Sequence, residues 1–283
     1  RAPDLCFSVK GDHKQQRKFI LGQLAMKHKV VACIPTKNTA WLLKDTLVHL
    51  SKFCDKIIIS DDGSTDETYD VCSSHMKVEY HKRKPREYGD RQGALQRQEL
   101  LTAAYAHDPD YFFFLDADEM PSPDIIDWIN SLDSRKKEKI NLWTFPWVHL
   151  WGDESHYRVD SYVAENGSKI NWDPFTTTYR KGFFVRNIPN LELKYDVKQH
   201  RVRPSNQPVN VPKPWYDVQT APVVIHYGKI SDYFTSEQNW RDRAIWDNYE
   251  KNAHMKRTLL HHRISNDEKT LKLKDIKKEW TWE

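Results

Sequence analysis

Residues 111–118 read YFFFLDAD, an apolar run that ends in two carboxylates separated by one alanine. Such a run is too apolar for a surface loop, so it predicts a strand that is buried on both faces. Two earlier runs are of the same kind, VVACI at residues 30–34 and III at residues 57–59, and residues 78–80 indicate a weaker strand. These four strands are the basis of the predicted fold.

Helical patterns lie between and after the predicted strands. Leucines recur at helical spacing in residues 41–50, an amphipathic pattern covers residues 90–106, and SPD at residues 122–124 indicates the start of another helix. Ser64 and Glu67 have the spacing of a capping box, which predicts that a helix begins at Ser64. The alternation of strands and helices predicts an α/β fold with a mostly parallel central sheet and helices on both faces.

The second half of the chain has a different pattern. Residues 141–150 and 182–185 belong to stretches that mix apolar and polar positions with Pro and Asn breaks, which favours antiparallel strands and loops. Residues 223–225 predict a short strand, residues 231–251 predict a helix, and the chain from about residue 256 onward is basic and polar. We therefore expect a smaller antiparallel region beside the central sheet.

Composition and charge exclude several classes of protein. The 283 residues include 44 Lys and Arg against 40 Asp and Glu, a net charge of +4, whereas nucleic-acid binders usually carry a larger basic excess. We therefore expect no nucleic-acid partner. No apolar run approaches the ~20 residues that cross a bilayer, so we expect no transmembrane segment. The four cysteines form no CxxC pair, which favours reduced thiols and a cytoplasmic protein.

Acidic residues follow the predicted strands, at the carboxyl ends where ligands bind in such sheets. Asp116 and Asp118 occupy alternate positions, so both carboxylates can face one divalent cation that is shared with phosphate oxygens. The alternative is a helix-capping Asp with a solvated neighbour. Residues 61–66 read DDGSTD, which is typical of a strand-to-helix turn but also offers carboxylates to a nucleobase or a ribose.

Four motifs in this order, VACIPTKN at 31–38, IISDDGSTD at 58–66, RQGALQR at 91–97 and FLDADE at 114–119, resemble a family 2 glycosyltransferase. The resemblance covers about the first 130 residues. It implies the GT-A (Rossmann-like) fold of the nucleotide-diphospho-sugar transferase superfamily. The implied activity is that of a metal-dependent inverting hexosyl- or pentosyltransferase in glycan biosynthesis. Such an enzyme moves a sugar from a nucleoside diphosphate sugar, usually a UDP-sugar, to a hydroxyl of a glycan or other carbohydrate acceptor.

The resemblance also assigns roles to individual residues. It implies that the donor is held by side chains of all four motifs, namely Pro35, Thr36, Asn38, Asp61, Asp62, Arg91, Asp116 and Ala117. Among these, Arg91 would lie near the base, and Asp116 would contact the ribose or a metal-bound water. Asp118 would ligate Mn²⁺ or Mg²⁺, which neutralises the diphosphate of the leaving group.

His226 is the third candidate metal ligand, together with Asp116 and Asp118. It follows the strand predicted at residues 223–225, and the segment IHYG at residues 225–228 looks like the late histidine segment of GT-A enzymes. A His ligand favours Mn²⁺ over Mg²⁺, which prefers oxygen. The alternative is a structural histidine that is hydrogen-bonded in the core.

The catalytic base is less well defined by the sequence. An inverting enzyme needs a carboxylate that removes the proton of the acceptor hydroxyl, yet no Glu-Asp pair of the usual family pattern stands at the expected place. Asp153 and Glu154, in WGDE, are the first candidates, and Asp173, in NWDP, is the next. Each is alternatively an ordinary loop acid. Five tryptophans offer faces for an acceptor sugar: Trp143, Trp147, Trp151, Trp172 and Trp215.

We find no linker, so we expect one domain over residues 1–283. It would comprise a nucleotide-sugar-binding half at about 28–135, an acceptor-side half at about 136–230, and a C-terminal helix and basic tail at 231–283. Two other functions remain open at this point. A sugar nucleotidyltransferase would need a glycine-rich phosphate loop after the first strand, and PTKN at residues 35–38 has no glycine. A non-catalytic carbohydrate-binding protein would use the aromatic residues alone.

Overall fold

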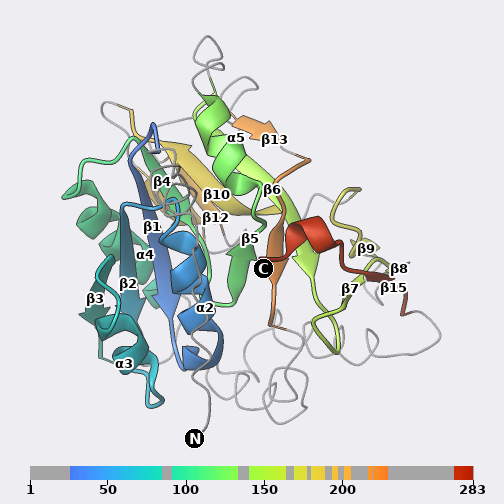
Figure 1. Ribbon diagram of the computed structural model, residues 1–283, viewed down its shortest axis with the longest axis horizontal. Coiled ribbons are helices and arrows are strands. Elements are labelled where there is room, and N and C mark those ends of the chain that lie inside the picture. The colour runs from blue at the N-terminus through green and yellow to red at the C-terminus, as the bar shows by residue number, and fades with distance from the viewer. Residues whose placement is uncertain are drawn as a thin grey trace, which may run out of the picture.

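Strands from both halves of the chain pair in one sheet, which has nine strands within the residues that the computed structural model describes (Figure 1). The described residues are 26–84, 91–132, 140–163, 169–176, 180–188, 193–196, 201–204, 216–218, 220–228 and 271–282. The helix expected at 231–251 and most of the basic tail lie outside them.

The first half of the chain supplies the parallel part of this sheet. β1 (Val30–Thr36), β2 (Lys56–Asp61), β3 (Val78–Lys82) and β4 (Tyr111–Phe114) pair in the order β3-β2-β1-β4, and each neighbouring pair is parallel. The apolar runs of the sequence therefore form adjacent buried strands, as expected.

The second half continues the same sheet. β10 (Arg180–Arg186) is antiparallel to β4, and β6 (Leu142–His149) is antiparallel to β10. β14 (Val224–His226) and β13 (Tyr216–Val218) then pair with β6 in parallel, and β5 (Glu119–Pro121) is antiparallel to β14. This mostly parallel α/β sheet confirms the predicted fold class.

Smaller antiparallel pairs lie beside the main sheet, as the second half of the sequence predicted. The pairs that the structure describes are β7 (His156–Arg158) with β15 (Leu273–Asp275), β8 (Ser161–Val163) with β9 (Lys169–Asn171), and β11 (Leu193–Asp196) with β12 (Arg201–Pro204).

Helices cover both faces of the sheet because side chains alternate along each buried strand. Val30, Ala32 and Ile34 face the core that α2 (Ala40–Leu50), α3 (Thr68–Ser73) and α5 (Ile125–Ser131) share. Val31 and Cys33 face the opposite core, which contains Leu100, Leu101 and Ala104 of α4 (Arg91–Tyr105). The sheet therefore lies between two apolar layers, and the polar side chains of the candidate site lie at the ends of its strands.

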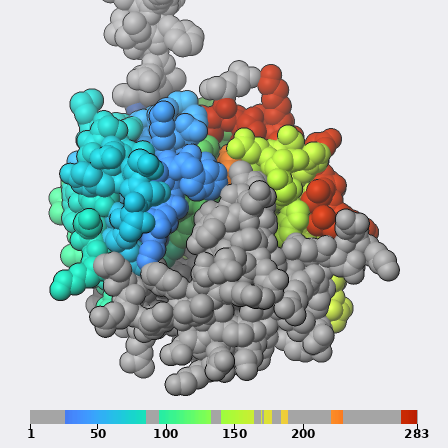
Figure 2. Space-filling model, turned by 90° about the horizontal axis from the view of Figure 1, so that it is seen from below, coloured from blue at the N-terminus to red at the C-terminus, as the bar shows by residue number. Residues whose placement is uncertain are grey.

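The described C-terminal segment packs on the second half of the sheet. Trp280, in the short 3-10 helix η3 (Lys278–Trp280), lies in an apolar cluster with Val148, Tyr157 and Ile225. Trp282 stacks on His49, with 4.7 Å between ring centroids, and its Nε1 donates to the carbonyl of Pro121 at 2.7 Å. Figure 2 shows this segment in red beside the yellow-green segment that carries β7.

Two helix starts differ from the predictions. α3 begins at Thr68 rather than Ser64, because Ser64 donates both its amide and its hydroxyl to Asp61 Oδ1 and so closes a turn. Asp66, and not Ser64, accepts hydrogen bonds from the amide and hydroxyl of Thr68. α5 begins at Ile125, directly after the SPD segment.

Two further predictions from composition concern the cysteines and a membrane-spanning segment. Cys33, Cys54 and Cys72 are free thiols in the core, and burial raises the pKa of each. Among the described residues, none of the helices has the length and apolar composition that crossing a bilayer requires.

Candidate functional site

Several of the predicted site residues lie at the carboxyl ends of strands of the main sheet. Thr36 ends β1, Asp61 ends β2, and His226 ends β14. Asp116 and Asp118 follow β4 in the turn that leads into β5. The sheet therefore gathers these side chains from distant parts of the sequence at one edge.

Asp61 is a buried carboxylate that is fixed through both of its oxygens. Oδ1 accepts the amide of Ser64 at 2.8 Å and its hydroxyl at 2.6 Å, while Oδ2 accepts the hydroxyl of Tyr80 on β3. Burial and the neighbouring Asp61 raise the pKa of Tyr80, so this phenol remains a donor. Asp61 thus has one orientation at the end of β2.

Asn38 ties the loop after β1 to the loop after β2. Its φ of 51° is in the left-handed region that asparagine tolerates, and its Oδ1 accepts the amide of Thr65 at 2.8 Å. Its own amide donates to Ser64 Oγ at 2.8 Å. Thr36 is buried and its hydroxyl bonds to that of Thr39, whereas Pro35 is half-buried. The structure therefore gives Asn38 a role in shaping the loops.

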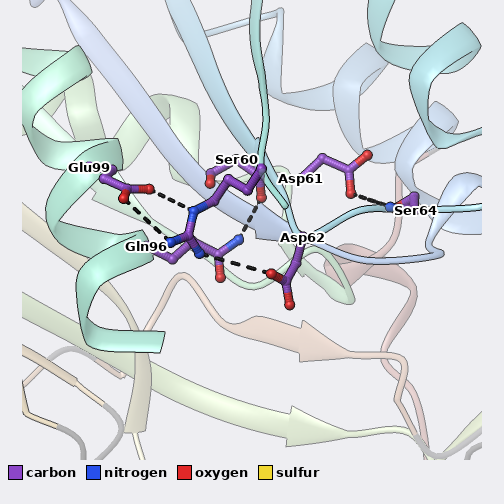
Figure 3. A network of polar contacts seen from close by, with 7 residues as sticks. Ser60, Asp61, Asp62, Ser64, Gln96 and Glu99 are labelled. Carbon is purple, nitrogen blue, oxygen red and sulfur yellow. Dashed lines mark hydrogen bonds and ion pairs between the residues drawn. The ribbon is translucent and has the colours of Figure 1, made fainter. Parts of the chain in front are cut away.

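Asp62 belongs to a polar network between the end of β2 and α4. Its Oδ1 lies 3.9 Å from Nη1 of Arg83, whose Nε lies 2.7 Å from Glu99 Oε2. Gln96 donates its Nε2 to the carbonyl of Ser60 at 2.7 Å. Figure 3 shows Gln96 and Glu99 facing the end of β2, with Asp61 directed toward Ser64 instead. The network fixes α4 against the end of β2, where Asp61 is the last residue of the strand and Asp62 follows it.

Asp116 is paired with Arg97, a residue for which the sequence predicted no role. Nη2 of Arg97 contacts Asp116 Oδ1, and the amide of Asp116 donates to Glu119 Oε2 at 2.8 Å. Arg97 lies in the motif that also contains Arg91, but its contact with Asp116 depends on how α4 packs on the sheet. Arg91 is the first residue of α4, and its side chain lies outside the described part of the structure. Ala117 is buried.

Asp118 and His226 face each other directly. Asp118 Oδ2 lies 3.2 Å from His226 Nε2, and the amide of Tyr227 donates to the carbonyl of Asp118 at 2.9 Å. The two side chains are 22% and 13% exposed, so they are sheltered but still reachable from solvent. Burial, followed by the charges of Glu154 and Asp45, raises the pKa of Tyr227 to about 12.

Gly228 lies against this pair. A Cβ at this position would stand 2.7 Å from Cε1 and Nε2 of His226 and 2.8 Å from Asp118 Oδ2. Separations under 3.0 Å require atoms to shift, so the absence of a side chain at residue 228 is a condition of the Asp118–His226 arrangement.

The donor set of this pair suits a divalent transition metal. One carboxylate and one imidazole match Mn²⁺ better than Mg²⁺, which prefers oxygen alone. Within the described residues, no three His, Cys, Asp or Glu side chains are gathered in a way that could hold a metal ion. Asp118 and His226 could thus supply two ligands, with the others coming from a bound diphosphate and water, while Asp116 is oriented by Arg97.

The three candidate bases lie in turns of the second half. Asp153 is exposed and accepts His156 Nδ1 at 2.8 Å and the amide of Ser155 at 2.7 Å, and these hydrogen bonds lower its pKa. Glu154 is exposed. Asp173 Oδ1 accepts the amide of Phe175 at 3.0 Å. Asp153 and Asp173 thus have structural partners that the sequence did not indicate.

The structure describes four of the five candidate tryptophans, and their surroundings differ. Trp143 is completely buried in the core beside Trp128, so it offers no face to a ligand. Trp147 and Trp172 both contact the ring of His149, which in turn contacts His226. Trp151 covers the guanidinium of Arg158 at 4.4 Å. Trp215 lies outside the described residues.

The family model of glycosyl transferase family 2 matches residues 31–135, which contain all four motifs. No curated protein matches the chain.

Solved structures give more distant matches. One is S. aureus TarS 1–349, which is 13% identical over 85% of this chain and 73% of that chain, with a TM-score of 0.43. The same protein in complex with UDP is 15% identical over 56% of this chain, with a TM-score of 0.39. The match spans 46% of that TarS chain, less than half of its length.

A third match is glucosyl-3-phosphoglycerate synthase from Mycobacterium tuberculosis, in complex with Mn²⁺, UDP and glucosyl-3-phosphoglycerate. It is 18% identical over 44% of this chain and 46% of that chain, with a TM-score of 0.33. The sequence motifs, the sheet that aligns them and the family match agree over the same part of the chain. Residues 31–135 of this chain are therefore similar to glycosyl transferase family 2.

Proposed function

We propose that this protein transfers a sugar from a nucleoside diphosphate sugar, with UDP as the nucleotide, to a hydroxyl of a glycan or other acceptor, with inversion at the anomeric carbon. The observation that carries the proposal is the contact between Asp118 Oδ2 and His226 Nε2, at the edge of the sheet where the family motifs end. This contact brings a carboxylate and an imidazole to the place where a diphosphate would lie.

The donor would lie across the ends of β1, β2 and β4. Asp61 would accept a hydrogen bond from the base or ribose, with its orientation set by Ser64 and Tyr80. The remaining contacts to the nucleotide sugar would come from Pro35, Thr36, Asn38, Asp62, Arg91, Asp116 and Ala117. Apart from Arg91, which begins α4, these residues stand on strand ends and on loops tied by hydrogen bonds, so the donor would meet a preformed surface.

Asp118 and His226 would hold Mn²⁺ or Mg²⁺ at the diphosphate. The bound ion supplies positive charge that offsets the charge growing on the leaving diphosphate. Arg97 would keep Asp116 turned toward α4, and Gly228 would leave room for Asp118 and His226 to share the ion.

The acceptor hydroxyl must lose a proton as it attacks, and a carboxylate of the second half would accept that proton. Glu154 is favoured over Asp153 because its charge acts on Tyr227, the neighbour of His226, whereas hydrogen bonds to Asp153 lower the pKa of that carboxyl and weaken it as a base. Asp173 is the other candidate, since it directly follows Trp172, which contacts His149 beside the site. The acceptor side would thus be formed by residues of about 136–230.

A thermal-shift screen of UDP, GDP, CDP and dTDP, each with and without Mn²⁺, tests the proposal. A ligand that binds only the folded chain raises its melting temperature. We expect the largest shift with UDP, and only when Mn²⁺ is present. Equal melting temperatures with all four nucleotides, with and without Mn²⁺, would contradict the proposal. Sugar transfer itself is then tested by measuring release of the nucleotide from its sugar donor, UDP from a UDP-sugar if UDP gives the largest shift.

A further inference from the structure

His149 is the last residue of β6, and its side chain meets that of His226 on the neighbouring strand. The register of β6 and β14 places the two residues opposite each other, and their Nδ1 atoms lie 3.1 Å apart. His226 therefore has His149 at one ring nitrogen and Asp118, 3.2 Å away, at the other.

His149 is held firmly in this position. Its side chain is buried, and its ring centroid lies 4.0 Å from that of Trp147 and 4.9 Å from that of Trp172. Trp147 also packs on His226, at 4.9 Å. The two imidazoles and the two indoles thus form one packed group, in which rotation of either histidine ring would lose contacts.

A hydrogen bond between two ring nitrogens needs a proton on one and a lone pair on the other. A histidine that binds a cation through Nε2 offers the lone pair of that atom, so the proton of its neutral ring is on Nδ1. For His226 this proton points at Nδ1 of His149, which must then be the acceptor.

We infer that His149 is a positioning residue whose Nδ1 accepts the Nδ1–H of His226 and so keeps the Nε2 lone pair of His226 directed at the cation. This inference rests on the proposed function, because it takes His226 to be a cation ligand. The second nitrogen of a ligating histidine is usually held by a carboxylate, a carbonyl or water. In this chain a second imidazole takes that place, and Trp147 and Trp172 set its orientation.

The test is the affinity of the full chain for Mn²⁺, alone and with UDP, followed by the electron paramagnetic resonance signal of free Mn²⁺. His149→Phe keeps an aromatic ring but removes the acceptor, and we expect it to weaken Mn²⁺ binding by about 10- to 100-fold. His149→Asn retains an oxygen acceptor near the position of Nδ1, and we expect it to restore most of the affinity. His49→Phe, at a histidine stacked on Trp282, is the matched control and should bind Mn²⁺ like the wild type.

The results separate this inference from the proposed function. Mn²⁺ binding of His149→Phe equal to that of the wild type, or of His149→Asn as weak as that of His149→Phe, overturns the inference. If His226→Ala weakens Mn²⁺ binding while His149→Phe does not, the inference alone fails. If His226→Ala binds Mn²⁺ like the wild type, the ligand role of His226 fails as well. Should His149→Phe not unfold cooperatively, His149→Leu takes its place with the same expected loss.

Discussion

His226 Nε2 lies 3.2 Å from Asp118 Oδ2, so the end of β14 and the turn after β4 meet at one point. Neither the sequence spacing nor the motif around Asp118 requires this meeting. It results from the pairing of β5 with β14, in which His226 stands opposite Glu119. The residue after Asp118 thus anchors the strand that brings in the histidine.

Gly228→Ala is expected to disturb this contact without unfolding the chain. The new Cβ would stand 2.7–2.8 Å from atoms of His226 and Asp118, which must move apart or rotate. We expect Mn²⁺ affinity, measured by the same resonance signal, to fall by about tenfold or more, as happens when the surroundings of metal ligands change.

Gly152→Ala is the matched control for that change. Gly152 has a φ of +82° and nothing within 4 Å of the position of a Cβ. Alanine there should cost about 1 kcal/mol of folding free energy through backbone strain, measured by urea unfolding, and should leave Mn²⁺ affinity unchanged. Equal Mn²⁺ affinities for Gly228→Ala and the wild type would show that the close approach at residue 228 has no bearing on the cation.

Ser64→Ala is expected to loosen Asp61. It removes a 2.6 Å hydrogen bond to a buried carboxylate and the acceptor of the Asn38 amide. We expect a loss of about 1–2 kcal/mol in the free energy of unfolding, together with weaker UDP binding in calorimetry. Ser73→Ala, which removes only an exposed hydroxyl within α3, serves as the control. Unchanged UDP affinity in Ser64→Ala would show that the nucleotide does not depend on the orientation of Asp61.

The Asp61–Ser64 turn also shows how far the sequence could predict the structure. The strands β1, β2 and β4 followed from apolar runs, because a strand buried on both faces needs apolar residues throughout. The helix start predicted at Ser64 was wrong, because a serine near an aspartate can either cap a helix or donate to the aspartate. Here the Ser64 hydroxyl donates to Asp61. Local pattern cannot decide between these two hydrogen bonds.

The contacts of Arg97 and His149 could not be predicted from the sequence, for a different reason. Arg97 reaches Asp116 only because α4 packs on the sheet, and His149 reaches His226 only because β6 and β14 share a register. When a side chain acts through a contact between distant segments, the residues next to it in the sequence do not indicate that contact. Asp118 and His226 could be predicted as site residues because each stands in a motif, but only the folded structure shows that their side chains lie 3.2 Å apart.

The buried pair Arg158–Asp160 should be costly to break. Arg158 donates Nε and Nη2 to the two oxygens of Asp160 at 2.5 and 2.7 Å, and its guanidinium lies 4.4 Å from the ring of Trp151. Asp160→Ala leaves a buried charge alone, and we expect a loss of about 3–5 kcal/mol in urea unfolding.

Two further variants make this prediction sharper. Replacement of both partners, as Arg158→Met with Asp160→Leu, should cost less than Asp160→Ala because no charge is left buried. Glu279→Gln, in the exposed pair with Lys277, should change stability by less than about 1 kcal/mol. If Asp160→Ala lowers the free energy of unfolding no more than Glu279→Gln does, the prediction that the buried pair is costly to break is wrong.

Glu79 should make stability depend on pH in the acid range. Burial acts to raise its pKa, but the hydrogen bonds from His107 and His81 outweigh burial, so the pKa lies below its ordinary value of 4.5. A carboxyl whose pKa is lowered on folding stabilises the folded chain fully above the ordinary value and loses this effect as the pH falls through the folded value. Wild type should therefore melt above Glu79→Gln at pH 6, and the difference should shrink below about pH 4.5. A difference that stays constant from pH 6 to pH 3.5 would rule out this linkage.

The central claim is that Asp118 and His226 hold the cation through which UDP binds. Isothermal calorimetry of UDP with the wild type and with Asp118→Asn, each with and without Mn²⁺, tests it most directly, because asparagine keeps the size of the side chain and removes its charge. We predict that Mn²⁺ strengthens UDP binding to the wild type and has no effect on UDP binding to Asp118→Asn. The same strengthening by Mn²⁺ in both proteins would contradict the claim.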